Sequence, residues 1–403
     1  MRLLATRLTA IASAVKRLFS PASLFRNSEQ GAWYDPSDFS TLFQNSAGTT
    51  PVTAVEQPVG LVLDKRKGLV RGSELVTNGT FDNGTTGWTA NGTATLAAEL
   101  GGMTVTSTSA AYSQGYQNIT ATPGKTYEIT FTGQRLSGAL AWVLVGDTPS
   151  AQRFAAIALS GTAPTPYRII VTAVENHIRL TVQTHNVSIG DKAFIDDASV
   201  RELPGNHATQ ATAASRPVLK QDANGKYYLF FDGVDDSLST GSIDFTSTDK
   251  MTVFAGVRKL SDAATGLVVE LSSSAVDNPG TFNIFAPVTG SADYRFTSKG
   301  VTSSDAIAAP GTNTAPRTSV LVGTGSISTD SSILRINGVQ AATSATDQGT
   351  GNYSSNPLYI GRRGGTSLPF NGHLYSLIVR GAQSSDSQIA SAESYVNSKT
   401  GAY

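Results

Sequence analysis

EQPVGLVLDKRKG, residues 56–68, and GNHATQATAASRPVL, residues 205–219, are the stretches that decide the fold. Joined, they read as an apolar strand, a turn and a second extended segment. The intervening residues 69–204 have their own start, their own strand alternation and their own ending. Because exposed loops tolerate the insertion of whole domains, we expect 69–204 to be a β-sandwich inserted into a second one, formed by 31–68 and 205–403.

The composition indicates a β-rich chain of two or three domains. The 403 residues are enough for that number of cores, and only 15% of them are charged, against about 25% in typical globular proteins. The formal net charge is zero, so no bulk attraction to nucleic acid or to anionic membranes is expected. The absence of cysteine excludes disulfides, thiol chemistry and cysteine-ligated zinc. No apolar run is long enough to predict a membrane span.

Strict alternation of apolar and polar residues predicts half-buried strands in the inserted segment. One such run surrounds Tyr127, Ile129 and Phe131, and another covers residues 178–182. A period of two leaves one face of each strand to solvent or to a ligand. Asn83-Gly84 supplies one of the turns.

The remainder of the chain predicts a series of strands followed by a helix. Asn337-Gly338 is a strong hairpin signal. Ser385 with Gln388 forms a capping-box pattern, and we expect the helix that it opens to end at Gly401. The predicted fold is therefore all-β, with two antiparallel jelly-roll-type β-sandwiches, an N-terminal helix and a short C-terminal helix.

The N-terminal helix is expected within residues 1–30, as a separate oligomerisation or docking segment. Its apolar residues follow a heptad spacing: Leu4, Leu8, Ile11, Val15 and Leu18. This spacing favours association of helices side by side. Together with the family resemblance described below, it makes a homotrimer the first expectation. A signal peptide, a membrane-surface helix and packing on the chain's own domain are the alternatives.

Two parts of the larger domain carry a family resemblance. GAWYDPSDFSTLFQNSAGTTPVTAVEQPVGLVLDK, residues 31–65, and FFDGVDDSL, residues 230–238, resemble concanavalin A-like (laminin G-like) lectin domains of bacteriophage virion proteins. The resemblance implies a place on the surface of a phage particle, at the head or the tail, as in a tail fibre. Other virion proteins would be partners, contacted through the N-terminal segment.

The inserted segment carries a second resemblance. ELVTNGTFDNGTTGWTANG, residues 74–92, and AFIDDASVREL, residues 193–203, are similar to the first and last strands of jelly-roll carbohydrate-binding modules. Such modules bind sugars by stacking on aromatic rings, with polar side chains fixing the hydroxyls. The candidate residues are Trp142, Tyr112, Tyr116, Arg179, His177 and Gln183. For Trp142, as for Trp88, burial in the core is the alternative.

Aspartates offer the main candidate cation sites, and a metal pair at His177 and His185 lacks a third ligand. A structural calcium could be held by Asp196, Asp197 and Asp147, although turn and strand-end roles would also explain these residues. Asp232, Asp235 and Asp236 are expected to form a turn, with a cation or ligand role as the alternative. No other cofactor is expected. The basic loop Arg362-Arg363-Gly364-Gly365 is expected to be solvated, with anion binding as the alternative.

The functional expectation is a non-enzymatic virion protein that binds host-surface polysaccharide. The sequence has no G-x-S-x-G, H-E-x-x-H or P-loop motif, and no strand with the paired carboxylates of the glucanase relatives of this fold. A purely structural component of the particle, such as a capsid decoration or a baseplate part, is the alternative. A polysaccharide-degrading enzyme is a minor one.

Overall fold

The structure, a computed structural model, describes residues 19–110, 112–146, 154–185, 188–273, 278–288, 292–308 and 311–403. Within these residues every strand pair is antiparallel, and a single α-helix, α1 (Asp386–Thr400), follows the strands. The all-β fold class is confirmed. The predicted N-terminal helix lies outside the described residues, and oligomerisation through it stays a prediction.

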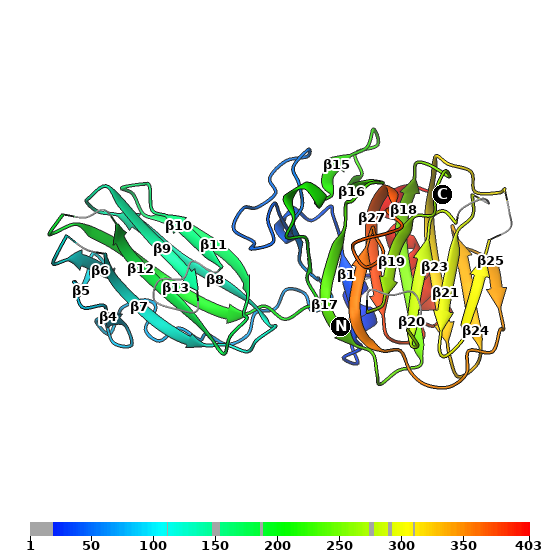
Figure 1. Cartoon of the computed structure of the whole chain (residues 1–403), viewed down its shortest axis with the longest axis horizontal. Helices are drawn as coiled ribbons and strands as arrows, with labels where there is room; N and C mark the ends of the chain where they lie inside the picture. Colours follow the sequence, from blue (N-terminus) through cyan, green and yellow to red (C-terminus); the bar gives the residue numbers. More distant parts are fainter. Residues whose placement is uncertain are drawn as a thin grey trace, which may run out of the picture.

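The larger part of the molecule contains two sheets, seen on the right in Figure 1. The first runs in the order β15 (Val218–Gln221), β16 (Tyr227–Asp232), β27 (Asn371–Arg380), β18 (Lys250–Lys259), β23 (Arg317–Ser326), β24 (Ser331–Ile336) and β25 (Val339–Ser344), with β1 (Gly31–Tyr34) also paired to β27. The second runs β2 (Leu42–Phe43), β3 (Leu61–Val62), β14 (Ala208–Thr209), β17 (Leu238–Asp244), β26 (Ser355–Ile360), β19 (Leu267–Leu271), β20 (Thr281–Phe285), β21 (Arg295–Lys299) and β22 (Ser303–Ile307). Short 3-10 helices lie at Pro21–Phe25 (η1), Phe39–Thr41 (η2) and Ala213–Ser215 (η3).

The smaller part, on the left in Figure 1, is a second sandwich of two sheets. One runs β11 (Thr165–Thr172), β8 (Thr126–Arg135), β13 (Lys192–Glu202), β6 (Gly102–Ser107) and β5 (Ala94–Glu99). The other runs β10 (Ala155–Ala158), β9 (Leu140–Gly146), β12 (His177–His185), β7 (Ser113–Thr120) and β4 (Thr89–Ala90).

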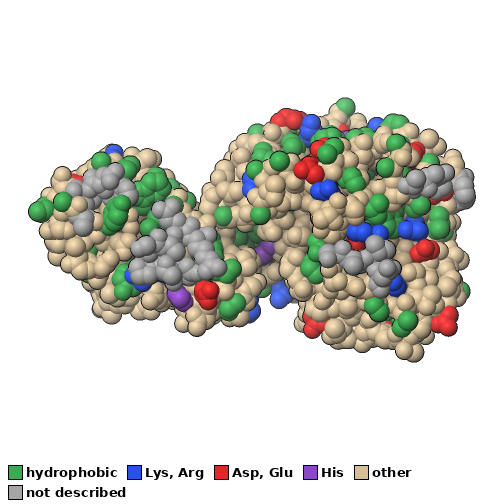
Figure 2. Space-filling view, in the orientation of Figure 1, with side chains coloured by type: hydrophobic (Ala, Val, Ile, Leu, Met, Phe, Trp, Pro, Cys, Tyr) green, Lys and Arg blue, Asp and Glu red, His purple; other side chains and the backbone are tan. Residues whose placement is uncertain are grey.

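Each sandwich has its own apolar core, because the alternating residues of its strands meet between its sheets. The larger core joins residues such as Val253 on β18 and Val269 on β19. The smaller core joins Ile129 on β8, Leu180 on β12 and Trp88, and none of its residues belongs to the larger core. Two separate cores explain the two bodies joined by a narrower region in Figure 2.

The chain leaves the larger sandwich after β3 and returns to it at β14. These strands pair with each other, with Val62 opposite Ala208. The buried Asp64 carboxylate follows β3 and accepts hydrogen bonds from the backbone of Trp33, Arg66 and Asn206. From the sequence, we expect residues 56–68 and 205–219 to be adjacent, because they read as one segment interrupted by an insertion. The pairing of β3 with β14 places them side by side.

A buried histidine completes the junction. His207 Nδ1 accepts a hydrogen bond from the Asp64 backbone N–H at 2.9 Å, and its Nε2 lies 3.0 Å from the Leu203 carbonyl oxygen. Burial lowers the pKa of His207, which favours the neutral ring that this pair of bonds needs. A small apolar cluster, including Phe43, Leu61 and Ile170, lies where the two sandwiches touch.

Two local sequence predictions in the larger sandwich are confirmed. Asn337 and Gly338 both have positive φ, 51° and 80°, and join β24 to β25 as a two-residue turn. Ser385 and Gln388 form a capping box, and Gly401 ends α1 in the left-handed conformation. The helix packs on the outer face of the first sheet, against residues such as Phe254 and Ile378.

The expectation of a solvated basic loop is wrong for Arg363. Its side chain is only 12% exposed and lies 2.7 Å from the Glu270 carboxylate, which is 3% exposed. An ion pair across 93 positions of sequence leaves no local signal. Within the described residues, no helix is long and apolar enough to cross a membrane.

Candidate functional site

The strongest candidate site is the outer face of the sheet β10-β9-β12-β7-β4, which we call the β12 face. On β12, Ile178, Leu180 and Val182 enter the core. Arg179, Thr181 and Gln183 alternate with them and therefore belong to the opposite, outer face. Cross-strand neighbours extend this face as follows: Gln114 and Tyr116 on β7, and Trp142 and Leu144 on β9.

Arg179 and Tyr116 form a stacked pair on the β12 face. The guanidinium carbon lies 3.2 Å from the centre of the Tyr116 ring. Arg179 is 7% exposed, and its buried Nε has no hydrogen-bond partner among the described residues. Because a buried donor without an acceptor costs about 1–3 kcal/mol, this group is suited to an oxygen supplied from outside the chain.

Two glutamines and a tryptophan lie beside this pair. The Gln114 amide donates to the Gln183 side-chain oxygen at 2.6 Å, and both residues are more than 90% buried. Trp142 is the cross-strand partner of Gln183 on β9, and it is half-buried outside the core. The β12 face therefore combines an aromatic surface with amide groups able to bind hydroxyls.

The other two predicted residues lie at opposite ends of the β12 face. His177 begins β12 opposite Thr120, and its Nδ1 lies 3.1 Å from the Asn176 side-chain oxygen. Tyr112 precedes β7 and is 55% exposed. The structure thus groups four of the six predicted residues, Trp142, Tyr116, Arg179 and Gln183. Sequence reasoning missed Gln114 and Thr181, which the period-two alternation on β7 and β12 could have indicated.

The proposed calcium ligands are described only in part, because Asp147 lies outside the described residues. Asp196 and Asp197 occupy an irregularity in β13, where Asp197 has a φ of 49°. Burial and the neighbouring charges of Asp197 and Asp82 raise the pKa of Asp196. The calcium site at these residues stays a prediction.

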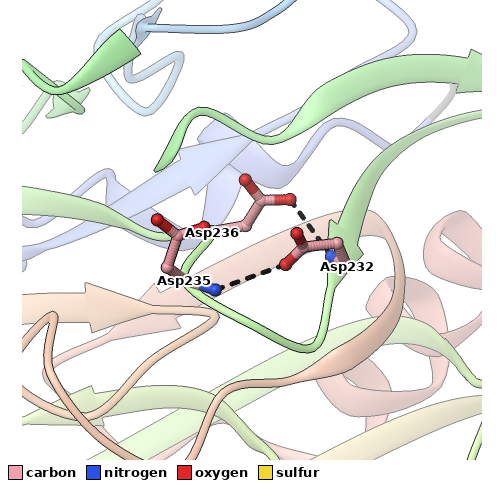
Figure 3. A group of neighbouring side chains, drawn as sticks. All are labelled: Asp232, Asp235 and Asp236. Carbon is pink, nitrogen blue, oxygen red and sulfur yellow. Dashed lines mark hydrogen bonds between the residues drawn. The ribbon is translucent and has the colours of Figure 1, made fainter. Parts of the chain in front are cut away.

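A second aspartate cluster closes the turn after β16 (Figure 3). One carboxylate oxygen from each of Asp232, Asp235 and Asp236 lies within 4.8 Å of the others, and within the described residues no other group of three possible ligands is this close. Asp232 accepts hydrogen bonds from the backbone of Val234 and Asp235, and Asp236 accepts one from the Asp232 backbone. Burial and the charges of Asp232 and Asp235 raise the pKa of Asp236 to about 6. These hydrogen bonds show that the three aspartates form a turn, as the sequence predicted.

The larger sandwich contains the part of the chain that matches a known family. Residues 232–390 match the concanavalin A-like lectin/glucanases superfamily. The concanavalin A-like match starts at Asp232, within the aspartate turn, and extends into α1. This agrees with the resemblance found in the sequence of the larger domain. No curated protein matches the chain.

Several solved structures are similar to parts of the chain. A structure described as "CBM4 structure and function" is 18% identical, with a TM-score of 0.26, and the match covers 32% of this chain and 99% of that one. The CBM40 of a Ruminococcus gnavus IT-sialidase, bound to sialyllactose, is 17% identical, with a TM-score of 0.30, covering 36% and 82%. A botulinum neurotoxin C/D receptor-binding domain is 8% identical, with a TM-score of 0.35, covering 48% of each chain. At such values these likenesses carry no functional argument.

Proposed function

We propose that the chain is a non-enzymatic carbohydrate-binding protein and that the β12 face is its binding surface. The observation that carries the proposal is the buried Nε of Arg179, which has no partner among the described residues and is held on the Tyr116 ring, on the same face as Trp142 and the Gln114–Gln183 pair. A concanavalin A-like domain in the same chain supports a lectin-like role. Fold alone does not decide function, so the argument depends on these side chains.

The arrangement binds a sugar by three kinds of contact. Half-buried aromatic rings at Trp142 and Tyr116 offer apolar surface to the C–H face of a pyranose ring. Arg179 donates hydrogen bonds to ring, hydroxyl or carboxylate oxygens of the ligand. Gln183 and Gln114 fix further hydroxyls through their amides. The stack on Tyr116 holds the guanidinium in place before binding, which reduces the entropy cost of ordering it.

The biological setting that we propose is the surface of a bacteriophage particle, where the chain forms a homotrimer and binds host polysaccharide. The heptad spacing of residues 4–18 and the resemblance of residues 31–65 to virion lectin domains support this setting. Three linked copies raise the avidity of weak sites without new contacts. Light scattering on the full-length protein tests the trimer, and a monomeric mass would contradict it.

Substitutions on the β12 face test the binding proposal. The purified full-length protein should bind some members of an array of bacterial surface polysaccharides. We expect Arg179→Gln to weaken that binding about 10- to 100-fold, because hydrogen bonds to charged groups contribute about 1.5–3 kcal/mol. Trp142→Ala should weaken it as well. Arg201→Gln is the matched control, since Arg201 lies on β13 in the other sheet and pairs with Glu74.

Two results would count against the proposal. If Arg179→Gln and Trp142→Ala bind polysaccharide as well as the wild-type protein does, the binding site does not lie on the β12 face. Complete absence of binding by the wild-type protein would favour a purely structural role in the particle. Release of reducing ends from any bound polysaccharide would contradict the non-enzymatic part and point to a degrading enzyme.

A further inference from the structure

The outer face of the first sheet in the larger sandwich has a region that α1 does not cover. Helix α1 packs over Phe254 and Ile378. Beyond it, toward the β15–β16 hairpin seen at the top of Figure 1, a pocket of about 360 Å³ lies between the hairpin turn and the end of β18. Its lining comes from three separate segments and includes several polar and charged side chains: Asp222, Ala223, Asn224, Arg258, Leu260, His373 and Tyr375.

Aromatic packing fixes the base of this pocket. The His373 ring lies flat against Tyr228, with ring centres 3.7 Å apart and an angle of 10° between the planes. Tyr375 is 1% exposed, and its hydroxyl lies 3.3 Å from an Asp222 carboxylate oxygen and 3.4 Å from His373 Nδ1. Burial, with the charges of Arg258 and Lys220, lowers the pKa of His373 to about 4. At neutral pH the histidine is therefore an uncharged hydrogen-bonding group.

The pocket holds a cation and an anion that do not pair with each other. Arg258 is half-buried and donates to the Thr318 hydroxyl at 3.3 Å. Among the described residues no carboxylate lies within ion-pair distance of it. Asp222 uses one carboxylate oxygen to accept from the backbone of Asn224 and Lys226, which closes the hairpin turn. Among the described residues, its other oxygen has a single contact, the long one of 3.3 Å with the Tyr375 hydroxyl.

We propose that this pocket is a second ligand site, which binds a sugar unit carrying a carboxylate, such as a hexuronate. Arg258 binds the carboxylate, since a guanidinium suits that group in charge and geometry. The Asp222 oxygen near Tyr375 accepts hydrogen bonds from ring hydroxyls, and the exposed amide of Asn224 donates to them. The volume is in the range of small-ligand pockets, about 300–1,000 Å³. The site shares no residue with the β12 face and does not depend on its function.

Titration of the full-length protein with glucuronic acid, followed by ligand-observed NMR and calorimetry, tests this site. Glucose and glycine are the comparison probes, because one lacks the carboxylate and the other lacks the sugar. We expect saturable binding of glucuronic acid, weakened about tenfold or more by Arg258→Gln. Asp222→Asn should also weaken binding, because it keeps the oxygen that closes the turn but replaces the oxygen near Tyr375 with a donor.

Matched variants separate this site from the other one. Arg26→Gln removes an exposed positive charge outside the pocket and should leave glucuronic acid binding unchanged. Arg179→Gln should leave it unchanged as well, whatever it does to polysaccharide binding. Equal affinity for glucose and glucuronic acid would overturn the assigned role of Arg258. Binding of glycine in place of glucuronic acid would overturn the sugar assignment, and no binding of either acid would overturn the site.

Discussion

The folded structure disfavours the ionised form of the Asp236 side chain. Its side chain is 6% exposed, it faces the carboxylates of Asp232 and Asp235, and its pKa is raised from 3.8 to about 6. Between these two pH values the folded state keeps a proton that the unfolded state has released. The free energy of unfolding contributed by this group therefore rises as pH falls from about 6 to about 4.

Replacing Asp236 by asparagine should stabilise the protein at pH 7. Asparagine keeps an oxygen for the Asp232 backbone N–H and removes the repulsion, which corresponds to about 1–2 kcal/mol after allowance for partial screening. Urea denaturation should show this gain at pH 7 and almost none at pH 4. Asp347→Asn, at an exposed turn, should change stability by less than about 0.5 kcal/mol at either pH. If Asp236→Asn does not raise the free energy of unfolding at pH 7, then repulsion among the three aspartates does not destabilise the folded protein.

Residue types and spacing predicted part of the candidate site but not its details. Period-two alternation placed Arg179 and Gln183 on one face of a strand. Alternation did not decide between core and surface for the tryptophans, because Trp88 follows a turn-rich stretch and Trp142 lies in a continuous apolar run. Trp88 lies in the core and Trp142 outside it. Cross-strand contacts such as the Gln114–Gln183 bond depend on register, which no local pattern specifies.

Helix α1 carries a specific sequence signal at each of its two ends. The Ser385 hydroxyl accepts a hydrogen bond from the Gln388 backbone at 3.3 Å, and the Gln388 side chain accepts from the Ser385 backbone at 3.0 Å. Inside the helix, Glu393 pairs with Arg335 on β24, which joins α1 to the sheet. The position of the helix therefore depends on its cap and on contacts distant in sequence.

Removing the cap should weaken this element measurably. We expect Ser385→Ala to lower the free energy of unfolding of the larger sandwich by about 1 kcal/mol, because the N–H group of Gln388 loses its acceptor. Ser391→Ala is the control, since the Ser391 hydroxyl only bonds back to the Ser387 carbonyl in the preceding turn, and its loss should be neutral or slightly stabilising. Equal losses in both variants, measured by chemical denaturation, would contradict a capping role.

Elements with strong local signals were predicted with their turns and caps, whereas the pairing of the shortest strands was expected only from the apparent continuity of 56–68 and 205–219. The Asn337-Gly338 hairpin follows from the positive φ that its turn type requires. Strands β3 and β14 have two residues each, too few for any periodicity. Pairing with β2 on one side and β17 on the other holds them in the sheet. These partners are set by the tertiary structure, so no local sequence pattern reveals them.

At the scale of the whole molecule, two cores without shared residues predict two cooperative folding units. Residues 69–204 alone should unfold in one calorimetric transition. The chain with 69–204 replaced by a short turn should also fold, because Val62 and Ala208 already face each other across a strand pair. Loss of the contacts around Phe43 and Ile170 should lower its stability only modestly. An unfolded deletion variant would show that the larger sandwich needs the insert.

The paired strands β3 and β14 also determine how the molecule carries a mechanical load. A pull on the smaller sandwich is transmitted through two connections that leave the larger one side by side. Asp64 accepts hydrogen bonds from Arg66 on the outgoing connection and Asn206 on the returning one, so the connections are tied together. Tension is therefore divided between the outgoing and the returning connection. Since both are pulled in the same direction, it does not act to separate β3 from β14. A sugar-bound smaller sandwich would thus be held by a double tether, and one connection could yield without releasing it.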